Sequence, residues 1–542
     1  MIDGPGIDND NKERRKIMLG KKLNVRVIYT AVLTVIMFIM MTGIALAADQ
    51  TGAGTDGKAV YDLVYSGQAL KEAIGRNSIA INFVWTLVAG FLVFFMQAGF
   101  AMVETGFTRA KNALHTMMMN LVIFVVGCLG FFMVGFALMF GGVGGVPSLG
   151  GGAELNGLFE IIKGWGIFGY KGFFLVTGGT YSVVAYAYFL FQVVFMDTAA
   201  TIPTGAMAER FRFKPFIIYG FFISMILYPL YGNWVWGGGW LAALGRNLSL
   251  GHGAVDFAGS GVVHAVGGFC ALAGALALGP RIGKYNKDGT PNAIPGHHLP
   301  MAFIGTIVLI FGWFGFNPGS TLAGTDLRIA VVAVNTMLSG VAGGFAAMLF
   351  MWLKFGKPDG SMTANGILAG LVAITAPSAF VEGWAAIIIG AVGGILVVVS
   401  VLFVERKLKV DDPVGAVSVH GVNGLWGLLA LGLFADGTYG IGWNGVGATA
   451  AKGVTGLFFG DPGQLIAQLI SMVVVVAWAF GASFIFFKVL NRFMRLRVKP
   501  EEELEGLDMT EIGALAYPEF SIVPGTGYSA EKVNGLKGGE LT

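Results

Sequence analysis

Two thirteen-residue stretches of the chain each place a histidine in otherwise apolar sequence. Asp256–Gly268 reads DFAGSGVVHAVGG, and Asp412–Gly424 reads DPVGAVSVHGVNG. Aligned without gaps, they share Asp, Gly, Val, His, Val and Gly at corresponding positions. An ionisable ring is costly inside a membrane, where it normally faces a transport path or a partner. The repeat therefore predicts that His264 and His420 form one functional pair.

The histidine pair has three other interpretations. The rings could be satisfied core residues that lock two helices together. A metal site would need more ligands at the same depth, and the other four histidines lie in loops or near a helix end. Ligation of a haem by His264 and His420 is compatible with the apolar surroundings, and a missing Soret band would exclude it. We favour the functional pair and expect neither a metal nor a cofactor.

Each motif opens with an aspartate at the expected start of a helix. Asp256 and Asp412 can accept hydrogen bonds from the free backbone amides there and complement the helix dipole. Direct contact with a cationic substrate is the alternative, since a carboxylate near a pore mouth attracts cations. We favour the capping role for both residues.

The composition indicates a membrane protein with many spans. Of the 542 residues, 55% are hydrophobic and 12% are charged, about half the charged share of an average soluble domain. The net charge of +3 is too small to suggest nucleic-acid binding. The 85 glycines favour close helix packing. Two cysteines, Cys128 and Cys270, lie in apolar segments and are expected to be small buried residues.

Eleven apolar segments of spanning length follow a polar stretch at 49–77. They cover about residues 80–103, 114–140, 181–206, 215–232, 257–279, 301–317, 329–353, 362–378, 383–404, 414–435 and 464–488. The loops after the first, third, fifth, seventh and ninth segments hold thirteen Lys and Arg, and the intervening loops hold five. By the positive-inside rule this alternation places the mature N-terminus outside and the C-terminus in the cytosol.

The two histidine motifs should run in opposite directions through the membrane. Asp256 opens the fifth span at its outer end, and Asp412 opens the tenth at its inner end. Opposed repeats of this kind form sites near the midplane between two halves. Eight helical residues rise about 12 Å, so His264 and His420 should meet at similar depth. The predicted fold is an all-α polytopic membrane protein with two inverted five-helix repeats and a final eleventh helix.

The N-terminus resembles a signal peptide. Basic residues between Lys12 and Arg26 precede an apolar run from Val27 to Leu46, and small residues follow it. We expect cleavage near Ala47 or Ala48, so that 1–48 is removed; an uncleaved anchor is the alternative. Residues 49–76 would then form an external segment.

Several motifs together resemble the ammonium transporter (Amt/Mep/Rh) family over about residues 77–520. Besides the two histidine motifs, they are FQVVF (191–195), AMAERFRF (206–213), WVWGGG (234–239) and GWFGFNPGS (312–320). The resemblance implies an eleven-helix bundle assembled as a homotrimer in the cell inner membrane. It also implies a transporter rather than an enzyme.

The resemblance assigns roles to five further residues. Trp236 and Ser320 correspond to the outer recognition site for the ammonium ion, where an aromatic face attracts the cation and a hydroxyl oxygen accepts an N–H bond. Phe195 and Phe316 correspond to a stacked gate below that site. Trp313 corresponds to a neighbour that lines the pore. Without the motifs, these aromatic residues would be interpreted as core packing or as anchors at the membrane interface.

The implied mechanism separates ammonium from potassium by chemistry. Ammonium can give up a proton, so neutral ammonia could cross an apolar channel in which a bare cation would be poorly solvated. His264 and His420 match the family's twin pore histidines. A carbon dioxide channel of the Rh type and an ammonium sensor are the alternative functions. Trp236 and Ser320 argue against the gas channel, because a neutral gas needs no cation site.

The chain ends in a segment expected to be cytosolic. The expected transporter domain covers 77–490, and a regulatory tail covers 491–542. Within the tail, PEEELEGLDMTEIGALAY (500–517) resembles the family segment that couples subunits and can dock a PII-type signalling protein. The usual His-Gly-Glu turn is here Ile512-Gly513-Ala514, so the coupling should differ in detail.

Asp197 departs from the family pattern. It lies two residues after Phe195, where small neutral residues are usual. Two helical steps rotate about 200°, so Asp197 should face away from the gate. We favour a contact between helices or subunits, and a carboxylate that relays protons is the alternative.

Overall fold

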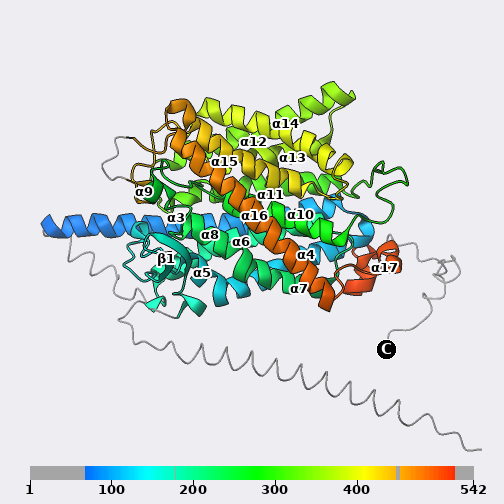
Figure 1. The fold of residues 1–542 in the computed structure, drawn as a ribbon, viewed down its shortest axis with the longest axis horizontal. Helices are drawn as coiled ribbons and strands as arrows, with labels where there is room; N and C mark the ends of the chain where they lie inside the picture. Colours follow the sequence, from blue (N-terminus) through cyan, green and yellow to red (C-terminus); the bar gives the residue numbers. More distant parts are fainter. Residues whose placement is uncertain (1–66, 177–178, 447–451, 519–542) are drawn as a thin grey trace, which may run out of the picture.

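The computed structural model describes residues 67–176, 179–446 and 452–518, which form a bundle of long helices (Figure 1). The predicted signal peptide at 1–48 lies outside the described residues, as does most of the external segment. The predominance of apolar helices confirms the expectation of a helical, multi-pass membrane protein.

Within the described residues, ten helices are long and apolar enough to cross a membrane. They cover Ile74–Phe107, Ala110–Phe140, Val183–Met207, Phe213–Trp236, Ser260–Leu278, Leu299–Thr321, Ile329–Phe355, Gly383–Arg406, Val417–Phe434 and Pro462–Phe493. One further apolar helix, α13, has 16 residues and occupies the position of the eighth predicted span. Each predicted window therefore has a helix, although the boundaries differ by several residues.

The described residues contain the following helical elements, of which α9, α17 and η12 lie outside both the spanning helices and α13. The α-helices are α3 (Gly67–Phe107), α4 (Ala113–Gly130), α5 (Phe136–Phe140), α6 (Val183–Met207), α7 (Phe213–Phe222), α8 (Tyr228–Trp236), α9 (Leu244–Leu248), α10 (Val266–Leu278), α11 (Leu299–Phe316), α12 (Ile329–Phe355), α13 (Gly360–Thr375), α14 (Gly383–Arg406), α15 (Asn423–Phe434), α16 (Pro462–Phe493) and α17 (Pro500–Glu505). The π-helical turns are η2 (Phe131–Gly135), η6 (Ile223–Leu227), η7 (Ser260–Ala265), η9 (Val417–Val422) and η12 (Asp508–Ile512). Two of these turns, η7 and η9, contain the histidines, and π-helical turns are frequent at functional sites.

The two ends of the bundle differ in structure. A two-stranded antiparallel sheet, β1 (Leu158–Ile162) and β2 (Trp165–Gly169), lies at one end, which we call the hairpin end (Figure 1). The short helix α17 packs at the opposite end, which we call the tail end (Figure 1). At the tail end Lys111 donates hydrogen bonds to the carbonyl groups of Glu503 and Leu504. The C-terminal segment is therefore docked on the bundle.

Local sequence signals explain where several helices begin. Ser182, Asp359 and Asp461 precede α6, α13 and α16, and each side chain accepts a hydrogen bond from a backbone amide of the first turn. These are favoured N-cap residues because they satisfy amides that have no partner within the helix. Gly356 ends α12 with a φ of 81°, a conformation that glycine adopts at little cost.

Glycine allows the helices to approach closely. A Cβ atom on Gly99 of α3 would lie 3.0 Å from the carbonyl oxygen of Gly305 of α11, and one on Gly394 of α14 would lie 2.0 Å from that of Gly343 of α12. Such contacts between small residues are characteristic of packing between membrane helices. The high glycine content is thus used where helix backbones touch.

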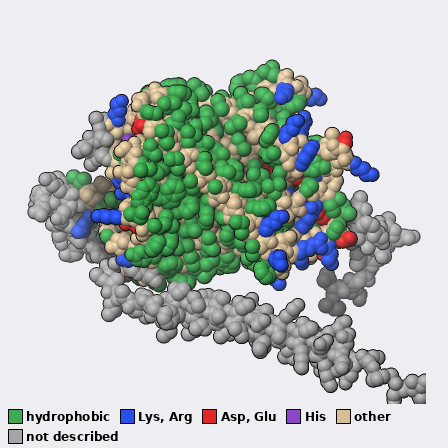
Figure 2. Space-filling view, viewed as in Figure 1, with side chains coloured by type: hydrophobic (Ala, Val, Ile, Leu, Met, Phe, Trp, Pro, Cys, Tyr) green, Lys and Arg blue, Asp and Glu red, His purple; other side chains and the backbone are tan. Residues whose placement is uncertain are grey.

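The surface carries an apolar band of exposed side chains. Figure 2 shows hydrophobic side chains covering the middle of one face, with Lys and Arg gathered toward its ends, mostly at the tail end. Large exposed apolar residues occur on the outer helices, for example Phe345, Ile485 and Val473, which is 70% exposed. Apolar exposure on this scale would be unfavourable in water, and it fits a lipid-facing surface. Helix α6 and the helix formed by η7 and α10 are the most buried.

Candidate functional site

The two histidines lie in direct contact inside the bundle. His264 is on η7 and His420 is on η9, and their Nδ1 atoms are 3.1 Å apart. The ring centroids are 5.2 Å apart with an interplanar angle of 22°. At this distance one ring donates and the other accepts, so each fixes the tautomer of the other. The spacing leaves no room for a haem iron between the two rings.

The backbones around the histidines cross in opposite directions. A Cβ on Gly268 would lie 2.1 Å from the amide nitrogen of Gly421, and one on Gly424 would lie 2.4 Å from the carbonyl oxygen of Ser260. Gly268, after His264, thus packs at the residue that follows His420, whereas Gly424, farther along the second segment, packs at Ser260, before His264. Glycine at both crossings lets the two rings come within hydrogen-bonding distance.

The motif aspartates bind the backbone amides before each histidine. Asp256 accepts hydrogen bonds from the amides of Gly259, Ser260, Gly261 and Val262, at 2.8–2.9 Å. Asp412 accepts hydrogen bonds from the amides of Gly415 and Val417. The helical turns begin at Ser260 and Val417, a few residues later than the sequence predicts. The predicted rise of eight helical residues before each histidine is therefore too long.

An aromatic column leads from the histidine pair toward the hairpin end. The rings of Phe195 and Phe316 are stacked, with centroids 4.1 Å apart. The His264 ring stacks on Phe316 at 5.4 Å and on Trp313 at 5.2 Å. Trp313 is fully buried, and its indole N–H donates a hydrogen bond to the Thr375 hydroxyl at 3.0 Å. The two phenylalanines thus close the space next to His264.

A cavity of about 140 Å³ lies above the stacked phenylalanines. Trp236, Ser320 and Phe195 line it, together with Tyr188, Phe191, Gln192, Phe257, Leu322 and Trp443. The indole N–H of Trp236 donates to the carbonyl oxygen of Asp256, and the Ser320 hydroxyl donates to that of Phe316. The ring of Trp236 and the oxygen lone pairs of Ser320 therefore remain available to a ligand in the cavity. Both are suited to an N–H-bearing cation.

Sequence reasoning did not single out several of the lining residues. Phe191 and Gln192 belong to the FQVVF motif, so their spacing from Phe195 could have indicated them. Gln192 has a buried side-chain oxygen without a hydrogen-bond partner in the described part of the chain. Trp443 comes from a loop of the second half, where no local pattern marks it.

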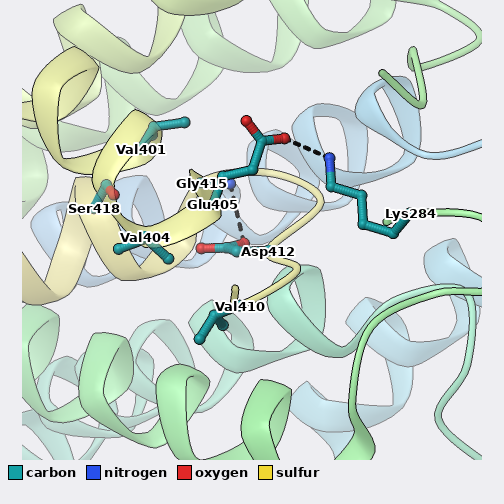
Figure 3. Close-up of a pocket in the computed structure, with 8 residues that line it drawn as sticks. All are labelled: Lys284, Val401, Val404, Glu405, Val410, Asp412, Gly415 and Ser418. Carbon is teal, nitrogen blue, oxygen red and sulfur yellow. Dashed lines mark hydrogen bonds and ion pairs between the residues drawn. The ribbon is translucent and has the colours of Figure 1, made fainter. Parts of the chain in front are cut away.

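A second, small cavity lies beside η9 toward the tail end (Figure 3). Its volume is about 30 Å³, enough for one or two water molecules. Asp412 and Ser418 line it, and Lys284 and Glu405 form an ion pair at 2.5 Å on its other side. The motif residue Asp412 therefore connects the segment before His420 to a polar cavity.

Comparison with known proteins identifies the family. The sequence profile of the Ammonium Transporter Family matches residues 84–517. The chain belongs to the ammonium transporter family. It is 48% identical over 493 residues to ammonium transporter Amt2 of Archaeoglobus fulgidus, covering 90% of this chain and 95% of that protein.

Solved structures of the same family have a similar fold. A protein described as a Sensor Amt Protein superimposes with a TM-score of 0.69 at 39% identity, covering 81% of this chain and 99% of that one. Mep2 of Candida albicans superimposes with a TM-score of 0.65 at 31% identity, covering 82% and 93%. The aligned relatives are named as transporters or sensors, which is the context for the cavity and the histidine pair.

Asp197 lies apart from the column in this member of the ammonium transporter family. Its side chain is on α6 and is 2% exposed. Its Oδ1 atom has no hydrogen-bond partner among the described residues, and Cys128 of α4 is close enough to interact with its charge. Asp197 is therefore buried close to α4.

A buried ionic network ties together loops at the tail end. Arg281 bonds the carboxylate of Glu209 at 2.8 Å and that of Asp411 at 2.9 Å, and Arg109 bonds Glu209 at 2.5 Å. Burial by itself raises the pKa of Asp411, but the charges of Arg210 and Arg281 and the hydrogen bonds from Arg281 hold that pKa well below its usual range. In the sequence these residues are recognisable only as charges in loops. The network joins the loop after α10 to the segment before His420.

The C-terminal segment caps exposed amides of the bundle. Asp508 accepts hydrogen bonds from the amides of Leu114 and His115 at the start of α4, and Glu511 accepts one from the amide of Phe213 at the start of α7. Two acidic tail residues thus satisfy helix N-termini, where negative charge is favourable. In the described part of the chain, no three His, Cys, Asp or Glu side chains converge to form a metal site.

Proposed function

We propose that this chain transports ammonium by binding the ion, removing its proton and conducting ammonia through the bundle. Trp236 and Ser320 would bind ammonium, Phe195 and Phe316 would gate the path, and His264 and His420 would line it, with Trp313 beside them. The observation that carries the proposal is the unbroken series of contacts from the cavity through the stacked rings to the histidine pair.

The chemistry of each step follows from the neighbouring groups. The Trp236 ring attracts a cation, and the Ser320 oxygen can accept one of its N–H bonds. The closed phenylalanine pair leaves no room for a hydrated ion, so a potassium ion would have to shed its water in apolar surroundings at high cost. Ammonium avoids that cost by leaving its proton behind. The paired imidazoles then offer polar contact without a fixed charge.

We further propose the arrangement that the loop charges predict. Helix α13 would be the eighth of eleven spans, and the two histidine helices would belong to inverted repeats. The hairpin end would face outward, and the tail end would face the cytosol of a cell whose inner membrane holds the protein as a homotrimer. Residues 1–48 would be a signal peptide, 49–76 an external segment, 77–490 the transporter domain and 491–542 the regulatory tail.

The docked tail also suggests a partner. The contacts of Asp508 and Glu511 with the bundle support a role in coupling the tail to the pore helices. We propose that a PII-type signalling protein can act at this face. A pull-down with purified PII-type protein, compared between the full chain and a chain ending at residue 499, tests this proposal.

Transport is tested with purified protein in liposomes. A sudden increase in the external ammonium concentration should produce a current or a pH change inside the liposomes. An equal increase in the potassium concentration should produce neither. Liposomes without any ammonium-dependent signal would contradict the proposed function. A carbon dioxide flux without an ammonium signal would favour the Rh-type gas channel.

Sensing is a second candidate because one structural neighbour is described as a Sensor Amt Protein. A sensor would use the same binding cavity without sustained flux. Saturable ammonium binding together with absent transport in liposomes would favour this function. Any signal would then have to pass through a partner that contacts the tail.

The Trp236→Leu variant should lose affinity for ammonium. The leucine keeps an apolar side chain but removes the ring, and a partly desolvated cation–π contact is worth about 1–2 kcal/mol, or about five- to thirtyfold. We expect the half-saturating ammonium concentration of the liposome current to rise by that factor. Trp352→Leu removes a tryptophan that is 52% exposed on α12 and should leave it unchanged. Equal half-saturation in wild type and Trp236→Leu would contradict the binding role.

The Asp197→Asn variant should transport normally. The amide has nearly the same shape, and the buried carboxyl makes no hydrogen bond through Oδ1 that would be lost. We expect ammonium-driven flux within twofold of wild type, and we propose a role in the helix contact for Asp197. A flux loss of about tenfold or more in a correctly assembled variant would instead establish Asp197 as a proton relay.

A further inference from the structure

Glu104 places a buried carboxyl between the histidine pair and the tail end of the bundle. It lies on α3, and its residue is 2% exposed. Phe100, one helical turn earlier, has its ring centroid 5.9 Å from that of His420. One turn advances about 5.4 Å and returns to the same side of the helix. Glu104 therefore lies one step farther along the path from His420 toward the tail end.

Polar side chains of two other helices hold the Glu104 carboxyl. The Thr204 hydroxyl of α6 and the Asn120 amide of α4 both donate hydrogen bonds to its Oε2 atom, the latter at 2.8 Å. Thr201 extends the cluster by donating to Asn120 at 2.8 Å, and Gln97 donates to Thr201 at 3.1 Å. Among the residues that the structure describes, no Lys, Arg or His forms an ion pair with Glu104. An ionisable group buried at membrane depth without a counter-ion is a strong candidate for a transport role.

The carboxyl also adjoins the segment that leads to His420. A Cβ on Gly205 of α6 would lie 3.1 Å from Cδ of Glu104 and 2.5 Å from Cγ2 of Val414. The side chains of Glu104 and Val414 therefore lie next to each other, over the same face of Gly205. Asp412, two residues before Val414, is close enough for its charge to act on Glu104.

We propose that Glu104 accepts the proton that leaves the His264–His420 pair and releases it at the tail end. The inference rests on the proposed function and adds a residue that neither the histidine motifs nor the outer site includes. The release point is the polar cavity beside Asp412, with the Lys284–Glu405 ion pair on its far side (Figure 3). This cavity lies on the opposite side of the histidine pair from the ammonium-binding cavity.

The transfer is balanced without any further reactant. The pair first takes up the proton of ammonium, as one N–H bond of the ion breaks and an N–H bond forms on a histidine ring. An N–H bond of the His420 ring then breaks while an O–H bond forms on Glu104, with water carrying the proton across the gap between them. The O–H bond then breaks, and the proton passes to water or to emerging ammonia, which becomes ammonium. The carboxylate is restored, and no electron is transferred.

Glu104 suits this role better than its neighbour Asp412. Both oxygens of Asp412 accept backbone amide hydrogens, from Gly415 and Val417, so protonating it would break the cap of η9. The hydrogen bonds from side chains to Glu104 reach only Oε2. The backbone of Gly205 also forms a hydrogen bond with this carboxyl, but Glu104 caps no helical turn, and its Oε1 has no side-chain donor among the described residues, so it can take up a proton.

Ammonium-driven currents from liposomes test the proposal. Glu104→Gln keeps the shape and an acceptor oxygen but cannot carry a proton, and we expect its current to fall at least about tenfold. Glu104→Asp and Glu104→Asn both shorten the side chain, but only the aspartate can carry a proton. The Glu104→Asp variant should therefore retain severalfold more current than Glu104→Asn. The exposed outer residue Glu382 provides the matched control, because Glu382→Gln should leave the current unchanged. Size-exclusion profiles would verify equal assembly.

The outcomes separate this inference from the proposed function. If wild type is active, two results would overturn the role of Glu104 and leave the proposed function intact. They are an equally active Glu104→Gln variant, and equal currents in Glu104→Asp and Glu104→Asn. An ammonia-linked pH change without any current in wild type would also overturn it, since no proton would then travel through the protein. Wild type without any ammonium-dependent signal would defeat the proposed function itself. A slower current in deuterium oxide for wild type, lost in Glu104→Gln, would support proton transfer rather than a packing role.

Discussion

Replacing His264 or His420 by alanine should reduce the ammonium-driven current on the order of a hundredfold, the usual effect of removing a positioned proton-transfer group. The two Nδ1 atoms are 3.1 Å apart, so loss of either ring leaves the other without the hydrogen bond that fixes its tautomer. Alanine also leaves a void, beside Phe316 for His264 and beside Phe100 for His420, through which water and small cations could enter. We therefore expect potassium-driven current to appear as ammonium-driven current falls.

Two further variants separate the loss of chemistry from the loss of volume. His264→Phe fills the site without a ring nitrogen, so it should remove the ammonium current without admitting potassium. His298 lies in a loop and is exposed, where it accepts a hydrogen bond from the amide of Met301. His298→Ala should therefore transport like wild type. Unchanged transport and selectivity in both His264→Ala and His420→Ala would reduce the pair to a structural contact.

The Arg281→Met variant should have the largest effect on stability. Methionine has similar length, but it leaves Asp411, which is 2% exposed, without its ion-pair partner, and it leaves the fully buried Glu209 with Arg109 alone. Removing one partner of a buried ion pair costs about 3–5 kcal/mol. We expect a markedly lower thermal unfolding temperature in detergent. Glu209 also has a φ of 71°, a strained conformation that the network helps to hold.

The predicted stability effect of Arg281→Met can be checked against a partly exposed ion pair and by varying the pH. Arg328 and Asp326 form an ion pair in which the side chains are 20% and 25% exposed. Arg328→Met breaks this pair and should lower the free energy of unfolding by only about 0–1 kcal/mol. In wild type the pKa of Asp411 is depressed, so its ion pairs stabilise the fold above the usual carboxyl pKa of about 4 and lose that effect as pH falls further. The difference in free energy of unfolding between Arg281→Met and wild type should therefore stay large from pH 7 to about 5 and narrow as the pH falls below about 4. A constant or growing difference would contradict the role of Asp411.

The helix boundaries illustrate how far hydropathy can predict a fold. Every predicted window contains a helix, because apolar segments that cross lipid must satisfy their backbone hydrogen bonds internally. The windows at 257–279 and 414–435 nevertheless start too early. Asp256 accepts hydrogen bonds from the amide of Gly259 and from the first three amides of η7, and hydropathy alone cannot detect such a cap.

The sequence by itself determined the class of protein, the pairing of His264 with His420 and the family. These depend on composition, spacing and motif order, all of which can be read along one chain. Only the tertiary structure decided the direction of the Ser320 hydroxyl, the buried network of Arg281 and the position of Glu104. Glu104 and Thr204 are 100 residues apart in sequence, and no local pattern predicts which polar side chains meet when helices pack. Hydropathy predicts which segments span the membrane, whereas helix packing determines which polar side chains contact one another.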